Sequence, residues 1–130
     1  MAIPQWILDE IDAFGRDAGL PGLAPGESGA VALRFENGLG FRFEYAFESL
    51  SVIATVRLRE TIDDETAEQL LRFAHPDAKY PFRLRTGYLA KTGCALFVAR
   101  IPEREVSRSF LSATFQGLWR IADGCRELKG

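Results

Sequence analysis

The feature of this sequence that most constrains its fold is a run of alternating apolar and polar residues directly after an Asn-Gly pair. The large apolar residues of this run take every second position: Leu39, Phe41, Phe43, Tyr45 and Phe47. A shorter alternation through Val31, Leu33 and Phe35 precedes Asn37-Gly38. Period-two alternation is typical of strands with one buried face, and Asn-Gly is the strongest short signal for a tight hairpin. The sequence therefore predicts a β-hairpin with one apolar face.

Periodicity on both sides of this hairpin predicts the other elements. In chain order they are a helix over 4–18, strands over 30–36, 39–47 and 51–58, a helix that begins at 61 or 63 and ends near 74, strands over 82–89 and 94–101, and a long helix that starts within 102–105. Gly19 stands where a left-handed C-terminal cap of the first helix belongs. We predict an α+β fold in which the helices pack on a twisted antiparallel sheet, built from a three-stranded meander and a two-stranded hairpin.

Composition limits the classes of protein to which the chain can belong. Its 130 residues, 47% of them hydrophobic, fit one domain with a sizeable core. A net charge of −2 argues against nucleic-acid binding, and no apolar run is long enough to insert into a membrane. Asp9, Glu10 and Asp12 interrupt any signal peptide, so we expect a cytoplasmic protein, with Cys94 and Cys125 as reduced structural thiols.

The sequence offers little material for catalysis or for holding a cofactor. His75 is the only histidine and stands directly before Pro76, without a second histidine or a cysteine beside it. Zinc sites and catalytic triads need such neighbours, and no phosphate-binding or nucleophile-elbow motif is present. We therefore expect no catalytic residue, no metal and no cofactor.

Two groups of residues suggest exposed surfaces. The apolar stripe of the first helix is formed by Ile7, Ile11, Phe14 and Ala18 at helical spacing. Trp6 and Leu8 lie off this stripe, so we expect them to face solvent. Arginines alternate along the later strands, at Arg57, Arg59, Arg83 and Arg85. They could face a phosphate, but we prefer the interpretation that they prevent edge-to-edge aggregation.

The last helix carries a second apolar row, through Leu111, Phe115, Leu118 and Ala122, so its apolar arc must be covered on two sides.

Short motifs in the first half of the chain carry a resemblance to a known family. They are Phe14-Gly15-Arg16, Gly19-Leu20-Pro21-Gly22-Leu23, Ala32-Leu33-Arg34-Phe35 and Phe43-Glu44-Tyr45. Together with the element order, they resemble the small class I type III secretion chaperones of the Tir-type family. The resemblance covers essentially the whole chain.

The resemblance implies a bacterial cytoplasmic homodimer without enzymatic activity, which binds the N-terminal region of a secreted effector, keeps it nonglobular and delivers it for secretion. By analogy with the family, the effector-binding residues are Trp6, Ile7, Leu8, Leu33, Phe35, Phe41 and Phe43. The dimer interface then involves Leu70, Leu71, Phe73, Phe82 and Leu84. The segment 74–81 contains two prolines and departs from the family pattern, as does the absence of an acidic C-terminal tail.

Two alternatives stay open. The chain could be a small α+β enzyme or ligand-binding domain with a cavity between sheet and helices, which would need converging polar groups. It could also be a structural or regulatory subunit that uses the same apolar surface for a permanent partner.

Overall fold

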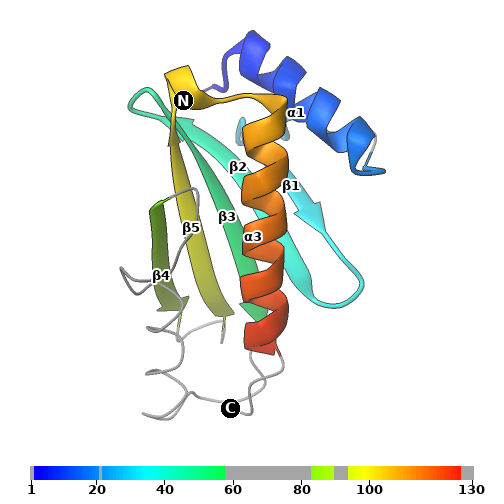
Figure 1. Ribbon diagram of the computed structural model, residues 1–130, viewed down its shortest axis with the longest axis vertical. Helices are drawn as coiled ribbons and strands as arrows, with labels where there is room; N and C mark the ends of the chain where they lie inside the picture. Colours follow the sequence, from blue (N-terminus) through cyan, green and yellow to red (C-terminus); the bar gives the residue numbers. More distant parts are fainter. Residues whose placement is uncertain (1, 21, 58–82, 90–93, 127–130) are drawn as a thin grey trace.

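A five-stranded antiparallel sheet forms the centre of the molecule (Figure 1). The structure is a computed structural model that describes residues 2–20, 22–57, 83–89 and 94–126. The strands are β1 (Val31–Arg34), β2 (Leu39–Ala46), β3 (Ser49–Arg57), β4 (Arg83–Leu89) and β5 (Cys94–Pro102). Their spatial order is β1-β2-β3-β5-β4, so β5 lies between β3 and β4. The meander and the later hairpin thus join into one continuous sheet.

The predicted hairpin is confirmed as β1 and β2. The Phe35 N–H donates to the Leu39 carbonyl at 2.9 Å, which closes the turn. The Asn37 side-chain oxygen accepts a hydrogen bond from the Leu39 N–H, and Gly38 has a φ of +92°. Glycine reaches such a left-handed conformation without steric cost, which is why this pair fixes the turn here.

The second turn, between β2 and β3, corrects one expectation. Phe47 continues the alternation in the sequence, but β2 ends at Ala46 and Phe47 is 83% exposed. Phe47 and Glu48 both have positive φ values, +51° and +56°, which are uncommon outside glycine. Strand β2 ends one residue earlier and β3 begins two residues earlier than the pattern indicates, and Phe47 therefore leaves the buried face.

Helix α1 (Gln5–Asp17) crosses one end of the sheet (Figure 1). Its buried side is formed by Ile7, Ile11 and Phe14, in agreement with the apolar stripe. Gly19 has a φ of +75°, and its N–H donates to the Arg16 carbonyl, so the predicted C-terminal cap is confirmed.

The last helix, α3 (Arg108–Arg126), begins later than predicted. Residues 103–105 form a separate 3-10 turn, η1 (Glu103–Glu105), instead of its first turn. The Ser107 hydroxyl accepts a hydrogen bond from the Phe110 N–H, and the Glu10 carboxylate of α1 accepts one from the Arg108 N–H. These two oxygens satisfy N–H groups that have no partner within the helix, so the helix starts where the caps are.

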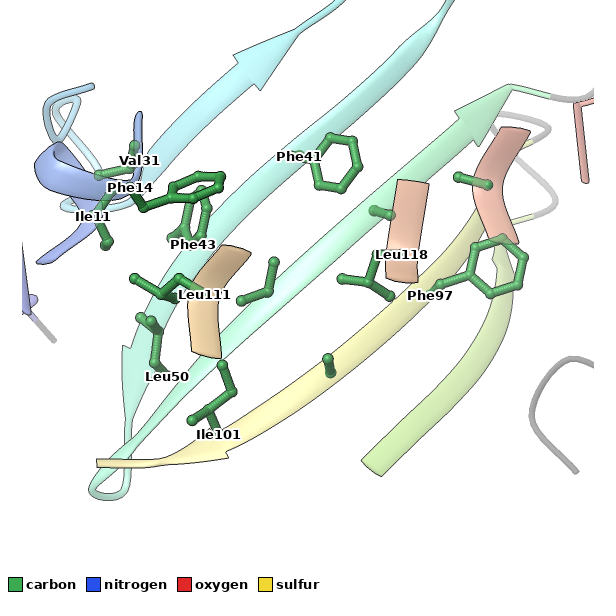
Figure 2. Packing of buried hydrophobic residues seen from close by; sticks show 14 of the residues in the cluster. Ile11, Phe14, Val31, Phe41, Phe43, Leu50, Phe97, Ile101, Leu111 and Leu118 are labelled. Atoms are coloured by element: carbon green, nitrogen blue, oxygen red, sulfur yellow. The ribbon is translucent and has the colours of Figure 1, made fainter. Parts of the chain in front are cut away.

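Both described helices pack on the same face of the sheet (Figure 1). Figure 2 shows Leu111 and Leu118 of α3 among the buried side chains of this face. Small residues of β3 and β5 let the helix approach closely: Ala54, Ala95 and Ala99. We call this side of the sheet the covered face, and its opposite the open face. The α+β class is confirmed, and the helix predicted over 61–74 lies outside the described residues.

Candidate functional site

The predicted effector-binding residues separate into two groups. Ile7, Phe41 and Phe43 are 0%, 2% and 0% exposed and belong to the core. Phe43 pairs with Val31 and Val52 on the neighbouring strands, and its ring lies 6.2 Å from that of Phe14. A partner on the surface of the folded chain cannot reach these three side chains. Sequence alternation identifies the face to which they point, but it does not tell core from groove.

The other four residues keep accessible surface. Trp6 on α1 is 45% exposed, in agreement with its place off the apolar stripe. Leu8, Leu33 and Phe35 are half-buried and pack against the edge of the core. These four side chains therefore remain candidates for contact with a partner.

An open hollow of about 450 Å³ adjoins Phe35. Its lining comes from the end of α1 and the residues after it, from Phe35, and from α3: Ala18, Leu20, Phe35, Phe115, Gln116, Trp119 and Arg120. Phe35 and Trp119 meet edge-to-face with ring centroids 4.9 Å apart, and Phe115 lies 5.9 Å from Trp119. Packed aromatic rings in this geometry form a rigid apolar wall. The amide of Gln116 and the guanidinium of Arg120 supply its polar groups.

Gly15 explains how the segment after α1 reaches this position. A Cβ atom on Gly15 would lie 2.6 Å from the Leu20 carbonyl oxygen and 2.7 Å from a methyl group of Leu23. Such distances are shorter than real contacts allow, so only glycine permits the close approach. The motif residues around Gly15 and Leu20 thus shape one side of the hollow.

Sequence analysis did not single out Trp119 or Phe115 as site residues. The sequence signal that could have identified them is the apolar arc of the last helix, which is wider than one face of a sheet can cover. Phe115 and Trp119 lie at the edge of that arc and are half-buried.

The outer edge of β1 lies at one margin of the sheet. Of the described strands, only β2 pairs with β1, along Val31–Arg34. An edge strand presents backbone N–H and C=O groups to which another extended segment can bind. One margin of the molecule therefore holds the unpaired edge of β1, the half-buried side chains of Leu33 and Phe35, and the aromatic hollow.

The residues assigned to a dimer interface are mostly outside the described part of the chain. Leu70, Leu71, Phe73 and Phe82 fall in the segment 58–82. Leu84 lies on β4, the other margin of the sheet, where it is half-buried and packs against the core from the covered face.

The surroundings of Tyr45 alter the pKa of its hydroxyl group. Tyr45 lies at the end of β2, and its hydroxyl donates to the Glu103 carboxylate at 3.1 Å. Partial burial of the ring, the hydrogen bond to Glu103 and the nearby Glu48 charge raise the pKa of Tyr45. Within the described ranges, no three His, Cys, Asp or Glu side chains gather as metal ligands do. None of the helices in those ranges is long and apolar enough to cross a membrane.

Comparison with known proteins rests on structure. No protein-family model matches the chain, and no curated protein matches its sequence. A chain of the ExsC–ExsE complex is similar with a TM-score of 0.76 and 22% identity, over 98% of this chain and 96% of that one. A chain of the HopA1–SchA chaperone–effector complex has a TM-score of 0.71 and 22% identity, over 97% and 99%. A chain from the Yersinia pestis type III secretion chaperone SycH in complex with a fragment of YscM2 has a TM-score of 0.69 and 14% identity, over 92% and 98%. The three likenesses establish a shared fold.

Proposed function

We propose that the chain is a type III secretion chaperone of the Tir-type class. In this proposal it is a cytoplasmic homodimer without enzymatic activity that binds the N-terminal region of an effector, keeps it soluble and nonglobular, and delivers it for secretion. The observation that carries the proposal is the structural likeness, over nearly the whole chain, to a chain of the HopA1–SchA chaperone–effector complex and to a chain of the complex of the type III secretion chaperone SycH.

The margin of the sheet at β1, together with the aromatic hollow, can accommodate an extended effector segment. An extended segment can hydrogen-bond to the free edge of β1 while an apolar side chain enters the hollow lined by Phe35 and Trp119. Leu33 adds apolar surface on β1 at this margin, and Trp6 and Leu8 add apolar surface on α1. A segment that orders on binding loses conformational entropy, so it needs a large contact surface to bind tightly.

The homodimer is a separate part of the proposal. We assign its interface to Leu70, Leu71, Phe73, Phe82 and Leu84, as the family resemblance implies. Light scattering should give twice the chain mass of 14.5 kDa. Leu71→Glu should weaken the dimer, because it places an unpaired charge in a desolvated contact. A monomer at micromolar concentration contradicts this part alone.

The chaperone role is tested by capture of the partner. The tagged chain is used to isolate bound proteins from the native cytoplasm, which are identified by mass spectrometry and then measured for affinity with pure components. We expect a secreted protein, bound through its N-terminal region. Capture of no secreted protein contradicts the proposed function.

A matched pair of variants tests the site. Trp6→Glu and Phe47→Glu each replace an exposed aromatic side chain, 45% and 83% exposed, by the same charge. We expect Trp6→Glu to weaken effector binding at least about tenfold, as for a central interface aromatic, and Phe47→Glu to leave it unchanged. Both should keep the helicity and melting temperature of the wild type. If the Trp6→Glu variant folds and binds the effector at full strength, the effector site lies elsewhere. If the variant does not fold, Trp6 belongs to the core.

One observation supports the alternative that the chain is a small-molecule-binding domain. The hollow of about 450 Å³ falls in the size range of small-molecule sites and has Arg120 and Gln116 in its lining. A small molecule that copurifies with the chain and is displaced by Trp119→Ala would favour this alternative over the chaperone.

A further inference from the structure

The turn between β2 and β3 presents an exposed aromatic ring on a strained backbone. Ala46 pairs with Ser49, so Phe47 and Glu48 alone form the turn, and their φ values are +51° and +56°. Two-residue turns with two positive φ values favour Asn and Gly, because other residues place their Cβ atom too close to the following carbonyl oxygen. Strained residues of this kind cluster at functional sites. We call Phe47 and Glu48 the exposed turn.

Hydrogen bonds hold the exposed turn in one position. The Glu103 N–H donates to the Glu48 carbonyl at 2.9 Å, and the Tyr45 hydroxyl donates to the Glu103 carboxylate. The turn is thereby tied to η1, while the Phe47 side chain stays 83% exposed. An apolar ring on a backbone that is already fixed loses little conformational entropy when a partner buries it. The exposed turn is therefore suited to insertion into a pocket.

The aromatic hollow is complementary to the exposed turn in shape and in charge. Its volume of about 450 Å³ is above the roughly 300 Å³ at which small-ligand pockets begin, so a phenyl ring can enter it. The rings of Phe35, Phe115 and Trp119 in its lining favour contact with a further ring. Arg120 is exposed at the hollow and forms no ion pair with the residues that the structure describes. Glu48 of the exposed turn offers a carboxylate of the opposite charge.

A single chain cannot bring the exposed turn into its own hollow. Phe41 stacks on Trp119 with ring centroids 6.0 Å apart, so the hollow lies beside this part of β2. Strand β2 continues from Phe41 to Ala46, and Phe47 follows, which places the turn roughly 20 Å from the hollow at about 3.4 Å per residue. The ring and the hollow can therefore meet only when they belong to different molecules.

We propose that the exposed turn of one copy of this chain binds in the aromatic hollow of a second copy. Phe47 enters the hollow, and Glu48 forms an ion pair with Arg120 of the second copy. The turn and the hollow are different parts of the surface, so the contact is heterologous and each copy can use both. A foreign partner would account for the turn or for the hollow, whereas a second copy accounts for both. One inserted ring buries little surface, so we expect a weak contact with a Kd of about 0.1–1 mM.

The self-contact occupies the hollow that the proposed function assigns to the effector segment. In this respect the inference rests on the proposed function, because the effector segment and the second copy then compete for one place. Effector affinity is measured at chain concentrations far below the Kd of the self-contact. The hollow is then open, so Phe47→Glu still leaves effector binding unchanged.

Sedimentation velocity at rising protein concentration tests the self-contact without any effector. We expect the sedimentation coefficient of the wild type to rise between about 10 μM and about 1 mM. Phe47→Asn removes the ring and suits a left-handed backbone, so it should abolish this rise and also raise the melting temperature by a few degrees. A wild type without the rise, or a Phe47→Asn variant that keeps it, overturns the proposal.

A mixture of two variants shows which surfaces meet. Phe47→Asn keeps the hollow, whereas the double variant Gln116→Glu/Arg120→Glu keeps the turn and repels it from its own hollow. The two changed positions are exposed on α3, so the double variant should fold. Each protein alone should fail to associate, and an equal mixture should associate, because the turn of one fits the hollow of the other. A mixture that behaves like its components overturns the proposal.

Charge reversal tests the ion pair. Glu48→Arg and Arg120→Glu should each weaken the self-contact about fivefold, and the combination of both should restore it, because the pair is then reversed. Glu105→Arg makes the same charge change on exposed η1 and should have an effect below about twofold. Equal weakening by Glu105→Arg, or no restoration in the combined variant, overturns the pairing of Glu48 with Arg120.

Two outcomes separate this inference from the proposed function. If no effector is captured but the wild type associates and Phe47→Asn does not, the self-contact stands and the chaperone role fails. If an effector is captured and the wild type does not associate, the self-contact alone fails. Once an effector segment is in hand, its addition should dissolve the larger species. Association that persists with the segment bound places the contact outside the hollow and overturns the proposal.

Discussion

The two faces of the sheet are built from alternate residues of the same strands, yet they differ in chemistry. The covered face carries Phe, Leu, Val and Ala side chains that are almost wholly buried under α1 and α3. The open face carries arginines at its margins and half-buried aliphatic residues at its centre. At their centres, β3 and β5 therefore carry apolar side chains on both faces: Ile53, Leu96 and Val98 lie on the open face. Apolar residues on both sides of a strand are typical of strands that are covered on both faces. The comparison indicates that folding of one chain completes the covered face and leaves the centre of the open face for another contact.

Truncation of one residue on each face should give the largest contrast in stability. Phe43→Ala removes a wholly buried ring that contacts Phe14, and we expect the free energy of unfolding to fall by about 3–5 kcal/mol. Ile53→Ala on the open face removes a half-buried side chain, and we expect a loss of about 1 kcal/mol. Urea unfolding followed by circular dichroism measures both values.

Equal losses in the two variants would contradict the difference in burial between the two faces. They would mean that Ile53 is as deeply covered in solution as Phe43, and the open face would then be an internal surface of the native protein.

A smaller effect is expected where the segment after α1 closes the margin of the covered face. Gly15→Ala places a methyl group against the Leu20 carbonyl, so we expect a loss of about 1–3 kcal/mol in the free energy of unfolding. Gly124→Ala in α3 is the matched control, since nothing lies within 4 Å of its added Cβ. It should be neutral or stabilising by up to about 1 kcal/mol, because alanine favours a helix over glycine. Thermal melts of the two variants that move in the same direction would contradict the role of Gly15.

Much of the fold follows from local patterns in the sequence. Alternation, the Asn37-Gly38 pair and the cap at Gly19 predict the strands, the first turn and the end of α1 nearly to the residue. These features depend on interactions between residues close in sequence, so a single sequence contains them. The start of α3 was missed because the hydrogen bond that the Arg108 N–H donates to the Glu10 carboxylate, nearly a hundred residues away in the sequence, helps to set it.

The candidate site could be predicted only in part. The exposure of Trp6 and the burial of Ile7 follow from their positions on the helix, whereas the burial of Phe41 and Phe43 depends on how α1 and α3 share one face. The hollow at Phe35 and Trp119 joins β1 and α3, and the set of arginines on the open face depends on β5 lying between β3 and β4. Contacts between distant segments decide both features, and periodicity in one segment does not contain them.

The smallest expected effect concerns Tyr45, at the end of the covered face where β2 meets η1. Partial burial, the hydrogen bond to Glu103 and the Glu48 charge raise the pKa of Tyr45 in the folded chain, whereas in the unfolded chain Tyr45 ionises at about pH 10. Below that value both states hold the proton, and the contribution of Tyr45 to stability is complete. As the pH rises further, the unfolded chain loses its proton first, so stability falls until the folded pKa is passed. Urea unfolding between about pH 9 and 11 should therefore show a decline that Tyr45→Phe reduces, since phenylalanine has no proton to lose. The same decline in Tyr45→Phe as in the wild type would mean that the hydroxyl does not couple β2 to η1 in solution, and this end of the covered face would then be held by packing alone.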